Sequence, residues 1–492
     1  MSHLPPALRW ALATASGCLN GAAFVYYGPL TLIANAPLLW ALRAAESGRE
    51  ASLLGAWVGF LGGVHIFGVL GYGWWIFWAF SLYTASQMTA FGWVTYRAWR
   101  RARSPLYELL APALIWTLTE WARTVGPVAL PASYVGCVAD VPWLRPLLSW
   151  ASAWGGLGVS ALIALLASAL AALAEPLWRP TPGARARRRA GLGALALTAA
   201  LYSWGALAPA PIEGERLRVA GLQGGFSNAH YEAASADPLL GSEIIRTYEL
   251  LMGQAAAAGV ELAVWAESAV RAPLLTEPDL RARLTPSSPR APWVIGGLAH
   301  TDPDGRSYNL AVSMREGVLV DRYAKVKTVP GVEARFTRGD AWRPVQTRWG
   351  PVGVLICFES IYPHAGRALA LEGARLLLVL SNDAGFGFTP ISHHMTNRAI
   401  VRAVEQGRWL LRVGQAGITA LVSPRGEVVA RLGLFEAGVL VGEARLRDEL
   451  TPYARWGLWW LWGVVALLLA PYIPRERLEF WRAPRSCSEP PP

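Results

Sequence analysis

The sequence predicts a multi-span α-helical membrane bundle of about eight transmembrane helices, with an α/β domain inserted before the last of them. Of the 492 residues, 53% are hydrophobic and only 16% are charged, whereas soluble proteins average about 25% charged residues. The chain contains 25 Trp, a residue that favours the membrane–water interface because its ring is apolar at one edge and polar at the other. Charge and short β-branched runs return only between residues 212 and 447.

Residues 1–210 are almost continuously apolar and form the predicted N-terminal membrane domain. A helix needs about 20 apolar residues to cross the hydrocarbon core, and such helices tolerate internal Gly and Pro. We therefore expect about seven spans in this domain. They are residues 7–23, 25–43, 52–71, 73–96, 105–122, 154–175 and 190–208. The first is interpreted as an uncleaved span, because a second apolar stretch follows it almost at once.

Arg-rich loops predict the orientation of these spans. The loops at residues 43–50, 96–105 and 178–191 are rich in Arg and alternate with poorly charged connections, including a long one at 123–153. Since cytoplasmic loops carry the excess of Lys and Arg, we expect these loops and the N-terminus inside. The net charge of +11 is then a topology signal. Nucleic-acid binding is not expected, because no basic patch with interleaved aromatic residues stands outside these loops.

The inserted domain is predicted at residues 211–448, on the outer face of the membrane. Apolar runs such as "RLRVAGLQ", "ELAVWAES" and "GPVGVLICFES" alternate with helical patterns at 241–258 and 391–407. Strands and helices that alternate in this way are typical of a layered α/β domain. The runs near 410–432 indicate instead a β-hairpin with "SPRG" as its turn.

The C-terminal part predicts one more span and a short tail. Residues 449–475 contain "WGLWWLWGVVALLLAPYI", which is expected to form the last transmembrane helix. The Arg-containing residues 476–492 are expected to be a cytoplasmic tail. Both termini of the chain are thus predicted on the cytoplasmic side.

The stretch "VLICFESIYP" places Cys357 after a run of Val, Leu and Ile. A free cysteine is often only a small buried hydrophobe. Cys357 is, however, the only cysteine of the inserted domain, since the others are Cys18, Cys137 and Cys487. An outward-facing compartment favours disulfides, so a lone thiol there is either buried and inert or retained for its chemistry.

Three strand ends of the inserted domain carry groups suited to acyl transfer, and we expect them to meet at one edge of an α/β sheet, where active sites form. Glu267 follows "ELAVWA", Lys325 follows "VLVDRYA" and Cys357 follows "VGVLI". Glu267 could take the thiol proton, and Cys357 could then carry an acyl group as a thioester. Lys325 and the backbone N–H of Phe358 could stabilise the oxyanion. Lys327 is an alternative to Lys325, because alternation along a strand would let either lysine point inward.

The motifs "WAES", "RYAK" and "ICFES", in that order, resemble the Glu-Lys-Cys triad of the nitrilase (carbon-nitrogen hydrolase) superfamily, and "LSNDAGFG" (380–387) resembles its next motif. An inserted domain between seven spans and one span resembles the apolipoprotein N-acyltransferase family over nearly the whole chain. "VPGVE" (329–333) and "TPYARWG" (451–457) are similar to motifs of that family. The resemblance implies a nitrilase-like αββα sandwich and favours Lys325 over Lys327.

The resemblance also implies a reaction and its partners. Cys357 would take an acyl chain from a phospholipid, for which we expect phosphatidylethanolamine. The α-amine of the N-terminal diacylglyceryl-cysteine of an apolipoprotein would then attack the thioester. The family implies a bacterial inner membrane, and we expect a monomer. No cofactor is implied, and no metal is expected because adjacent His393 and His394 do not form a chelating pair on a helix.

The resemblance also suggests supporting residues and mobile lids over the site. Glu333 and Glu359 could position the Lys325 amine or the substrate amine, or could equally be structural ion-pair partners. A thioester must be guarded from water, so lids are expected at 224–242 and 383–394. The second lid contains Gly385, Phe386 and Gly387. Its Gly385 replaces a family aromatic residue, just as Lys327 replaces a His and Phe358 replaces a Tyr.

Two other functions remain open from the sequence. A membrane-tethered amidase could hydrolyse an amide with the same triad, because water and amines both attack thioesters. Eight spans favour the acyltransferase, since a hydrolase of soluble amides needs only one anchor. A non-enzymatic scaffold is disfavoured, because Glu267, Lys325 and Cys357 are all present.

Overall fold

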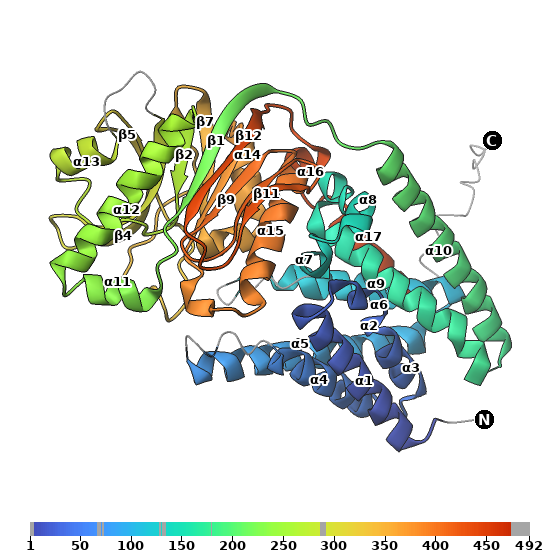
Figure 1. The fold of residues 1–492 in the computed structure, drawn as a ribbon. Coiled ribbons are helices and arrows are strands. Elements are labelled where there is room, and N and C mark those ends of the chain that lie inside the picture. Colours follow the sequence, from blue (N-terminus) through green and yellow to red (C-terminus); the bar gives the residue numbers. More distant parts are fainter. Residues whose placement is uncertain are drawn as a thin grey trace, which may run out of the picture.

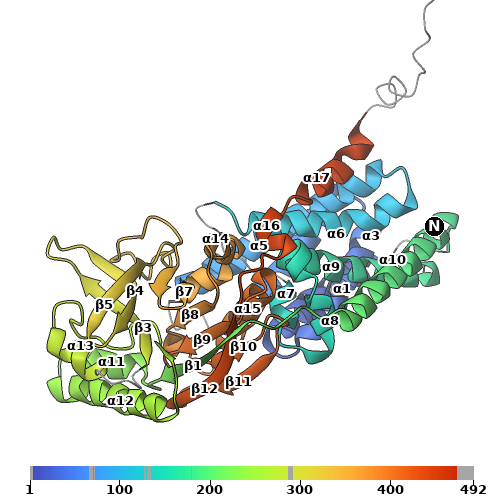
Figure 2. The same ribbon diagram turned by 90° about the horizontal axis from the view of Figure 1, so that it is seen from above.

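The protein consists of a helical bundle and a two-sheet domain that lie side by side (Figures 1 and 2). The computed structural model describes residues 4–65, 70, 73–126, 129, 134–178, 180–285 and 292–473. The predicted tail at 476–492, with Cys487, lies outside the described residues.

The bundle is built from the N-terminal part of the chain. Its elements are α1 Pro6–Val25, η1 Gly28–Leu30, α2 Thr31–Ala34, α3 Ala36–Ala44, α4 Gly48–Val64, α5 Trp74–Arg101, α6 Pro105–Ala122, α7 Tyr134–Val138, η3 Pro142–Leu144, α8 Arg145–Leu148, α9 Ala151–Trp178 and α10 Pro182–Leu207. Three of the long helices begin with a side-chain cap: Ser47, Ser104 and Thr181 each accept the backbone N–H three residues on. Such caps satisfy a backbone donor that a helix start leaves free, so these helices begin just after their polar connections.

The predicted set of about eight spans is confirmed only in part. Among the described residues, two helices, α9 and α10, are long and apolar enough to cross a membrane. The predicted span 25–43 is interrupted, because Pro29 and Pro37 lie in the first turns of separate segments, η1 and α3. The prediction of a loop at 178–191 is wrong from Pro182 onward. These residues form the first turns of α10, because Ala and Arg are good helix formers.

The last predicted span is also shorter than expected. It comprises α16 Pro452–Trp456, α17 Leu461–Leu469 and η6 Ala470–Tyr472. Gly457 ends α16 with a positive φ of 62°, a conformation that glycine adopts without steric cost. The apolar sequence is therefore divided by a turn rather than forming one continuous helix.

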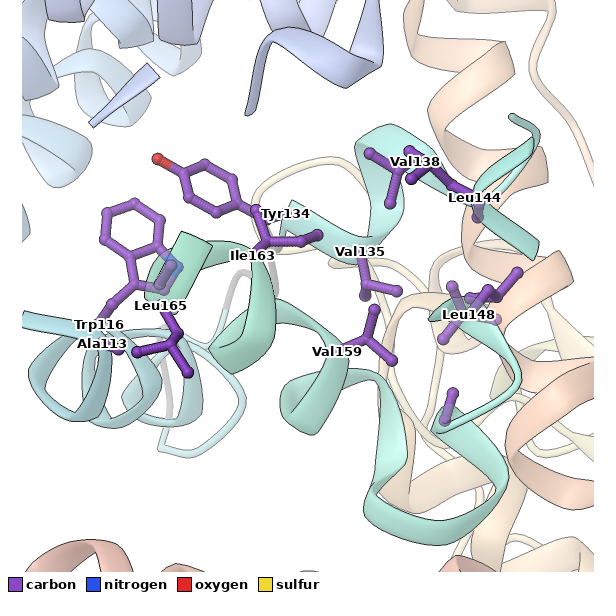
Figure 3. Packing of buried hydrophobic residues seen from close by; sticks show 14 of the residues in the cluster. Ala113, Trp116, Tyr134, Val135, Val138, Leu144, Leu148, Val159, Ile163 and Leu165 are labelled. Carbon is purple, nitrogen blue, oxygen red and sulfur yellow. The ribbon is translucent and has the colours of Figure 1, made fainter. Parts of the chain in front are cut away.

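Close packing of small residues joins the bundle helices. A Cβ atom on Gly55 of α4 would lie 2.0 Å from the carbonyl oxygen of Met88 in α5, so only glycine permits this approach. Beside it, the Thr84 hydroxyl donates to the carbonyl of Gly59 at 2.9 Å. Figure 3 shows Val135 of α7 beside Val159 of α9 and Tyr134 of α7 beside Trp116 of α6, whose rings stack with 4.3 Å between their centres.

The second part of the molecule contains two six-stranded sheets. Their strands are β1 Glu215–Gln223, β2 Leu262–Trp265, β3 Trp293–Thr301, β4 Ser307–Arg315, β5 Val318–Ala324, β6 Val345–Thr347, β7 Gly350–Ile356, β8 Leu377–Ser381, β9 Leu410–Gly414, β10 Thr419–Val422, β11 Val428–Leu432 and β12 Gly438–Leu446. The sheet orders are β12-β1-β2-β3-β4-β5 and β11-β10-β9-β8-β7-β6. In each sheet the central strands β1-β2-β3 and β7-β8-β9 are parallel and the flanking pairs are antiparallel.

Helices cover the outer faces of the paired sheets, as the predicted αββα sandwich requires. They are α11 Asn228–Ala234, α12 Pro238–Ala257 and α13 Pro278–Leu284 with the first sheet, and α14 Pro363–Leu371 and α15 Ile391–Gln406 with the second. Helix α15 is buried except at His393 and Arg398. It lies between the second sheet and the bundle (Figure 1), and its apolar residues share one core with α6, α7 and α9.

Most of the predicted strands and helices of this domain are confirmed, and the hairpin needs a correction. The turn "SPRG" does join β10 to β11, with Gly426 at a φ of 78°. The run 410–432 is nevertheless a three-stranded meander, because β9 also pairs with β10. Strands β6 and β12 were not predicted. β12 closes the first sheet by pairing along the whole of β1, a contact between distant segments that no local pattern reveals.

Candidate active site

Cys357 lies on a sharp turn at the end of a buried strand. It follows β7 directly and is the first residue of η4 Cys357–Ile361. Its φ is 49°, a left-handed conformation that costs a residue with a Cβ about 1–2 kcal/mol. Its side chain is half-buried. Strained backbone of this kind persists where the surrounding structure holds it in place, often at active sites.

Lys325 joins two carboxylates at the end of the first sheet. Its Nζ lies 2.9 Å from Oε1 of Glu267 and 2.8 Å from Oε1 of Glu333. The Asn309 amide donates to the same two oxygens, at 2.7 and 3.1 Å. Lys325 is 1% exposed and Glu267 is 5% exposed. The structure thus brings Lys325, and not Lys327, to Glu267, and it makes Glu333 an ion-pair partner of the lysine.

Glu359 has a different place from Glu333. One of its oxygens accepts the Tyr323 hydroxyl at 2.7 Å and the backbone N–H of Val326 at 2.7 Å, and the other accepts the N–H of Ile356 at 2.8 Å. Glu359 is fully buried. It therefore ties the segment after Lys325 to the turn that carries the cysteine, rather than contacting the Lys325 amine.

The second sheet supplies a further polar group beneath the cysteine. The Ser381 hydroxyl donates to Oδ1 of Asp383 at 2.6 Å, and Arg412 forms an ion pair with the other oxygen of Asp383. The next residue, Asn382, donates its backbone N–H to Oε2 of Glu267 at 2.9 Å. This contact links the two sheets across the site, because Glu267 follows β2 and Asn382 follows β8.

The electrostatic environment keeps the thiol protonated and the lysine charged. Burial raises the pKa of Cys357, the Glu267 carboxylate raises it further, and Lys325 opposes them. Burial lowers the pKa of Lys325, but the charges of Glu267, Cys357 and Glu333 outweigh burial and raise it. Burial also raises the pKa of Glu359. Of the charged groups around the thiol, Glu267 has the largest effect on the pKa of Cys357.

The first predicted lid segment is joined to the residue just before the second. The amide of Asn382 donates to the side chain of Asn228 at 3.3 Å, where α11 begins. Gly385 and Phe386 belong to the short η5 Ala384–Phe386, and Gly387 ends it with a φ of 56°. Whether these segments move remains a prediction. Among the described residues, no group of three or more His, Cys, Asp or Glu could hold a metal ion.

Several residues of this site were missed in the sequence. Asn309 carries no local signal that separates it from other amides, whereas Asn382 lies in the "LSNDAGFG" motif but was given no role. Arg412 did carry one, since a charged residue inside the apolar run "WLLRVG" is rarely buried without a partner. The interpretation of the site as one sheet edge was also too simple. Both sheets contribute, with Glu267 and Lys325 from the first and Cys357 from the second.

Comparison with known proteins covers both parts of the molecule. The carbon-nitrogen hydrolase family model matches residues 239–449, and the model of the apolipoprotein N-acyltransferase N-terminal domain matches residues 16–169. An apolipoprotein N-acyltransferase of Azotobacter vinelandii is 31% identical over 95% of this chain and 95% of its own length. Proteins of the same name from Pseudomonas aeruginosa and Geobacter metallireducens are 29% identical, over 93% and 94% of this chain.

Solved structures are more distant. A carbon-nitrogen hydrolase from Helicobacter pylori covers 55% of this chain and 96% of its own, with 17% identity and a TM-score of 0.38. This likeness is too low to carry an argument about activity, so the family assignment rests on the relatives that match nearly the whole chain.

Proposed function

The chain belongs to the apolipoprotein N-acyltransferase family, and we propose that it moves an acyl chain from a phospholipid to the α-amine of an N-terminal diacylglyceryl-cysteine. The observation that carries the proposal is the buried contact of Lys325 with Glu267 and Glu333, beside a cysteine held on a strained turn. These groups can perform each proton transfer and charge stabilisation that acyl transfer through a thioester requires.

In the first half-reaction, Glu267 takes the proton of the Cys357 thiol as the sulfur attacks the ester carbonyl of the phospholipid. The C=O becomes a tetrahedral oxyanion, which the Lys325 ammonium and the backbone N–H of Phe358 stabilise. When the intermediate collapses, the C–O bond breaks and the proton on Glu267 passes to the departing alkoxide. A lysophospholipid leaves, and the acyl group remains on Cys357 as a thioester.

In the second half-reaction, the lipoprotein amine attacks the thioester carbonyl. Glu267 accepts a proton from the attacking amine, and the same groups stabilise the second oxyanion. The C–S bond then breaks, an amide is formed, and the proton on Glu267 returns to the thiolate. Because the donor leaves before the acceptor reacts, we expect ping-pong kinetics.

We further propose the membrane arrangement that these lipid substrates require. The bundle, with α9 and α10 as its longest apolar helices, would lie in a bacterial inner membrane as part of an eight-span domain of residues 1–210 and 449–475. The two-sheet domain, 211–448, would face the outer side, with both termini cytoplasmic. The Arg-rich connections support this orientation. A monomer would suffice, because all proposed catalytic groups come from one chain.

Intact-protein mass spectrometry tests the proposal. The purified protein is incubated with phosphatidylethanolamine in detergent, and we expect a mass gain of one acyl chain that hydroxylamine removes. Cys357→Ala should show no gain, and a diacylglyceryl lipopeptide should discharge the wild-type adduct. If no phospholipid forms an adduct while Cys357 still reacts with thiol reagents, the proposal fails. An amidase would then be favoured.

A further inference from the structure

Lys327 lies beside the proposed nucleophile but outside the Lys325 cluster. Its Nζ is 5.6 Å from the centre of the Tyr362 ring. That ring contacts Phe358, the residue after Cys357, at 5.4 Å between ring centres. The Tyr362 hydroxyl donates to the carbonyl of Ala129 at 2.8 Å, in the segment that follows α6. Lys327 is therefore near the place where the two-sheet domain meets the bundle.

The charge of Lys327 is not neutralised by the part of the chain that the structure describes. Lys325 has two carboxylate partners, whereas Lys327 is half-buried and forms no ion pair with any described residue. Its backbone N–H is fixed by Glu359 at 3.1 Å, so the side chain projects from an anchored position. A partly buried ammonium without an ion-pair partner is suited to an anionic ligand.

The surroundings of Lys327 are cationic as well. His364, with its ring 5.5 Å from that of Tyr362, has its pKa lowered to about 4 by partial burial and then by Arg402 and Lys327. Arg402 is itself paired with Glu405 at 2.9 Å. Of Arg402, His364 and Lys327, Lys327 is thus the cation that remains available to an anionic ligand. The neutral side chains of His364 and Tyr362 do not form an ion pair with it.

The short separation of Lys325 and Lys327 fits the spacing between the ester and the phosphate of a lipid that reacts at Cys357. The Cα atoms of Lys325 and Lys327 are at most about 7 Å apart, because a single residue separates them along the chain. In a glycerophospholipid, the reacting ester and the phosphate are joined by the short glycerol unit. When the ester carbonyl lies between Cys357 and Lys325, the phosphate can therefore reach the neighbouring lysine.

We propose that Lys327 binds the phosphate of the donor lipid and so makes the enzyme select phosphate-bearing lipids over neutral ones. This inference rests on the proposed function, since it assigns the donor's head to a residue of the same site. The side chain donates charge-assisted hydrogen bonds to phosphate oxygens and takes no part in proton transfer.

The test compares two donors with the same acyl chains, phosphatidylethanolamine and diacylglycerol. Acyl-enzyme formation is timed for the wild type, Lys327→Gln, Lys327→Arg and the control Arg246→Gln, an exposed cation on α12. Lys327→Gln should slow the reaction of phosphatidylethanolamine by about tenfold or more, as loss of a charged hydrogen bond predicts. It should leave the diacylglycerol rate within about twofold, and Lys327→Arg should restore most of the loss.

Two results would overturn the assignment. An equal loss with both donors would mean that Lys327 acts on the thiol or the fold, and an unchanged rate would mean that it does not touch the donor. Thermal unfolding and thiol titration of each variant exclude misfolding as the cause. Inorganic phosphate should not raise the diacylglycerol rate of the wild type, because an increase would indicate a free-phosphate site. If the wild type forms no acyl-enzyme from either donor, the proposed function itself fails.

Discussion

Two of the charged clusters in the described part of the chain differ in the balance of their charges. At the candidate active site, one ammonium, Lys325, meets two carboxylates, Glu267 and Glu333. In the bundle, two guanidinium groups meet two carboxylates, and each carboxylate is shared. The bundle residues are Arg43, Glu108, Glu175 and Arg187. One cluster therefore carries an excess negative charge beside a thiol, while the other is neutral and encloses no reactive group.

The geometry of the bundle cluster fits a role in holding helices together. Arg187 of α10 donates to both oxygens of Glu175 of α9, at 2.7 and 2.5 Å, and reaches Glu108 of α6 at 2.8 Å. Arg43 of α3 donates to the same Glu108 oxygen at 2.8 Å. Four helices are thus joined by ion pairs whose charges cancel. We call the first cluster, of Lys325, Glu267 and Glu333, the reactive cluster after its proposed role, and the second the balanced cluster.

Removing the excess carboxylate should have the largest effect. Glu267→Gln keeps the shape of the side chain but removes the base, so acyl-enzyme formation should fall by about 10²–10⁴-fold. Because Glu267 raises the pKa of Cys357, the same change should lower that pKa. Iodoacetamide should then alkylate the thiol at lower pH than in the wild type.

Lys325→Met gives the matched control for this prediction, because Lys325 lowers the pKa of Cys357. Alkylation should then require higher pH than in the wild type, while acyl transfer is again lost. If both variants shift the alkylation profile in the same direction, the two charges do not act on the thiol as inferred.

Breaking the balanced cluster should affect stability instead of chemistry. Arg187→Met leaves two carboxylates with only Arg43, and removal of one partner of a buried pair costs about 3–5 kcal/mol. Thermal unfolding in detergent should show the loss, while the acylation rate per folded molecule stays near that of the wild type. The double variant Arg187→Met with Glu175→Leu should recover much of the stability, because an apolar pair leaves no charge unpaired. A double variant no better than the single one would contradict this.

The sequence predicted the reactive cluster better than the balanced one, because each residue of the reactive cluster follows a short pattern of neighbouring residues. Glu267, Lys325 and Cys357 each follow a short apolar strand, and strand ends are recognisable from a few neighbouring residues. The bundle cluster joins four helices, and its Arg43 and Arg187 lie in stretches that were interpreted only as loops setting the orientation of the spans. No local pattern specifies which distant helices will meet.

The same limit explains the errors in the fold. The site was predicted at one sheet edge because the order of strands along the chain does not reveal that they divide into two sheets. For the same reason the pairing of β1 with β12, which joins Glu215 to Leu446, was not predicted. Span 25–43 was predicted as continuous because membrane helices tolerate Pro. Here Pro29 and Pro37 instead begin new segments. Hydrophobicity thus predicted where helices lie and not where they break.

A smaller effect is expected at the second carboxylate of the reactive cluster. Glu333→Gln leaves Lys325 paired with Glu267, so the charge of the lysine is retained, but one charged hydrogen bond is weakened. The acylation rate should fall by about 10–100-fold. Single-turnover rates with phosphatidylethanolamine measure the change. A loss as large as that of Glu267→Gln would mean that Glu333 shares the role of base, and the assignment of one base would then be wrong.

The smallest effect should come from a neutral partner of the balanced cluster. Trp99 lies 3.8 Å from the Arg43 guanidinium, measured to the ring centre, and its Nε1 donates to the Glu108 carbonyl at 2.7 Å. Trp99→Leu removes both contacts and leaves all four charges paired, so we expect a loss of about 1–2 kcal/mol. Thermal unfolding in detergent measures it, and acylation should not change. A loss equal to that of Arg187→Met would mean that the aromatic ring, and not charge balance, stabilises this end of the bundle.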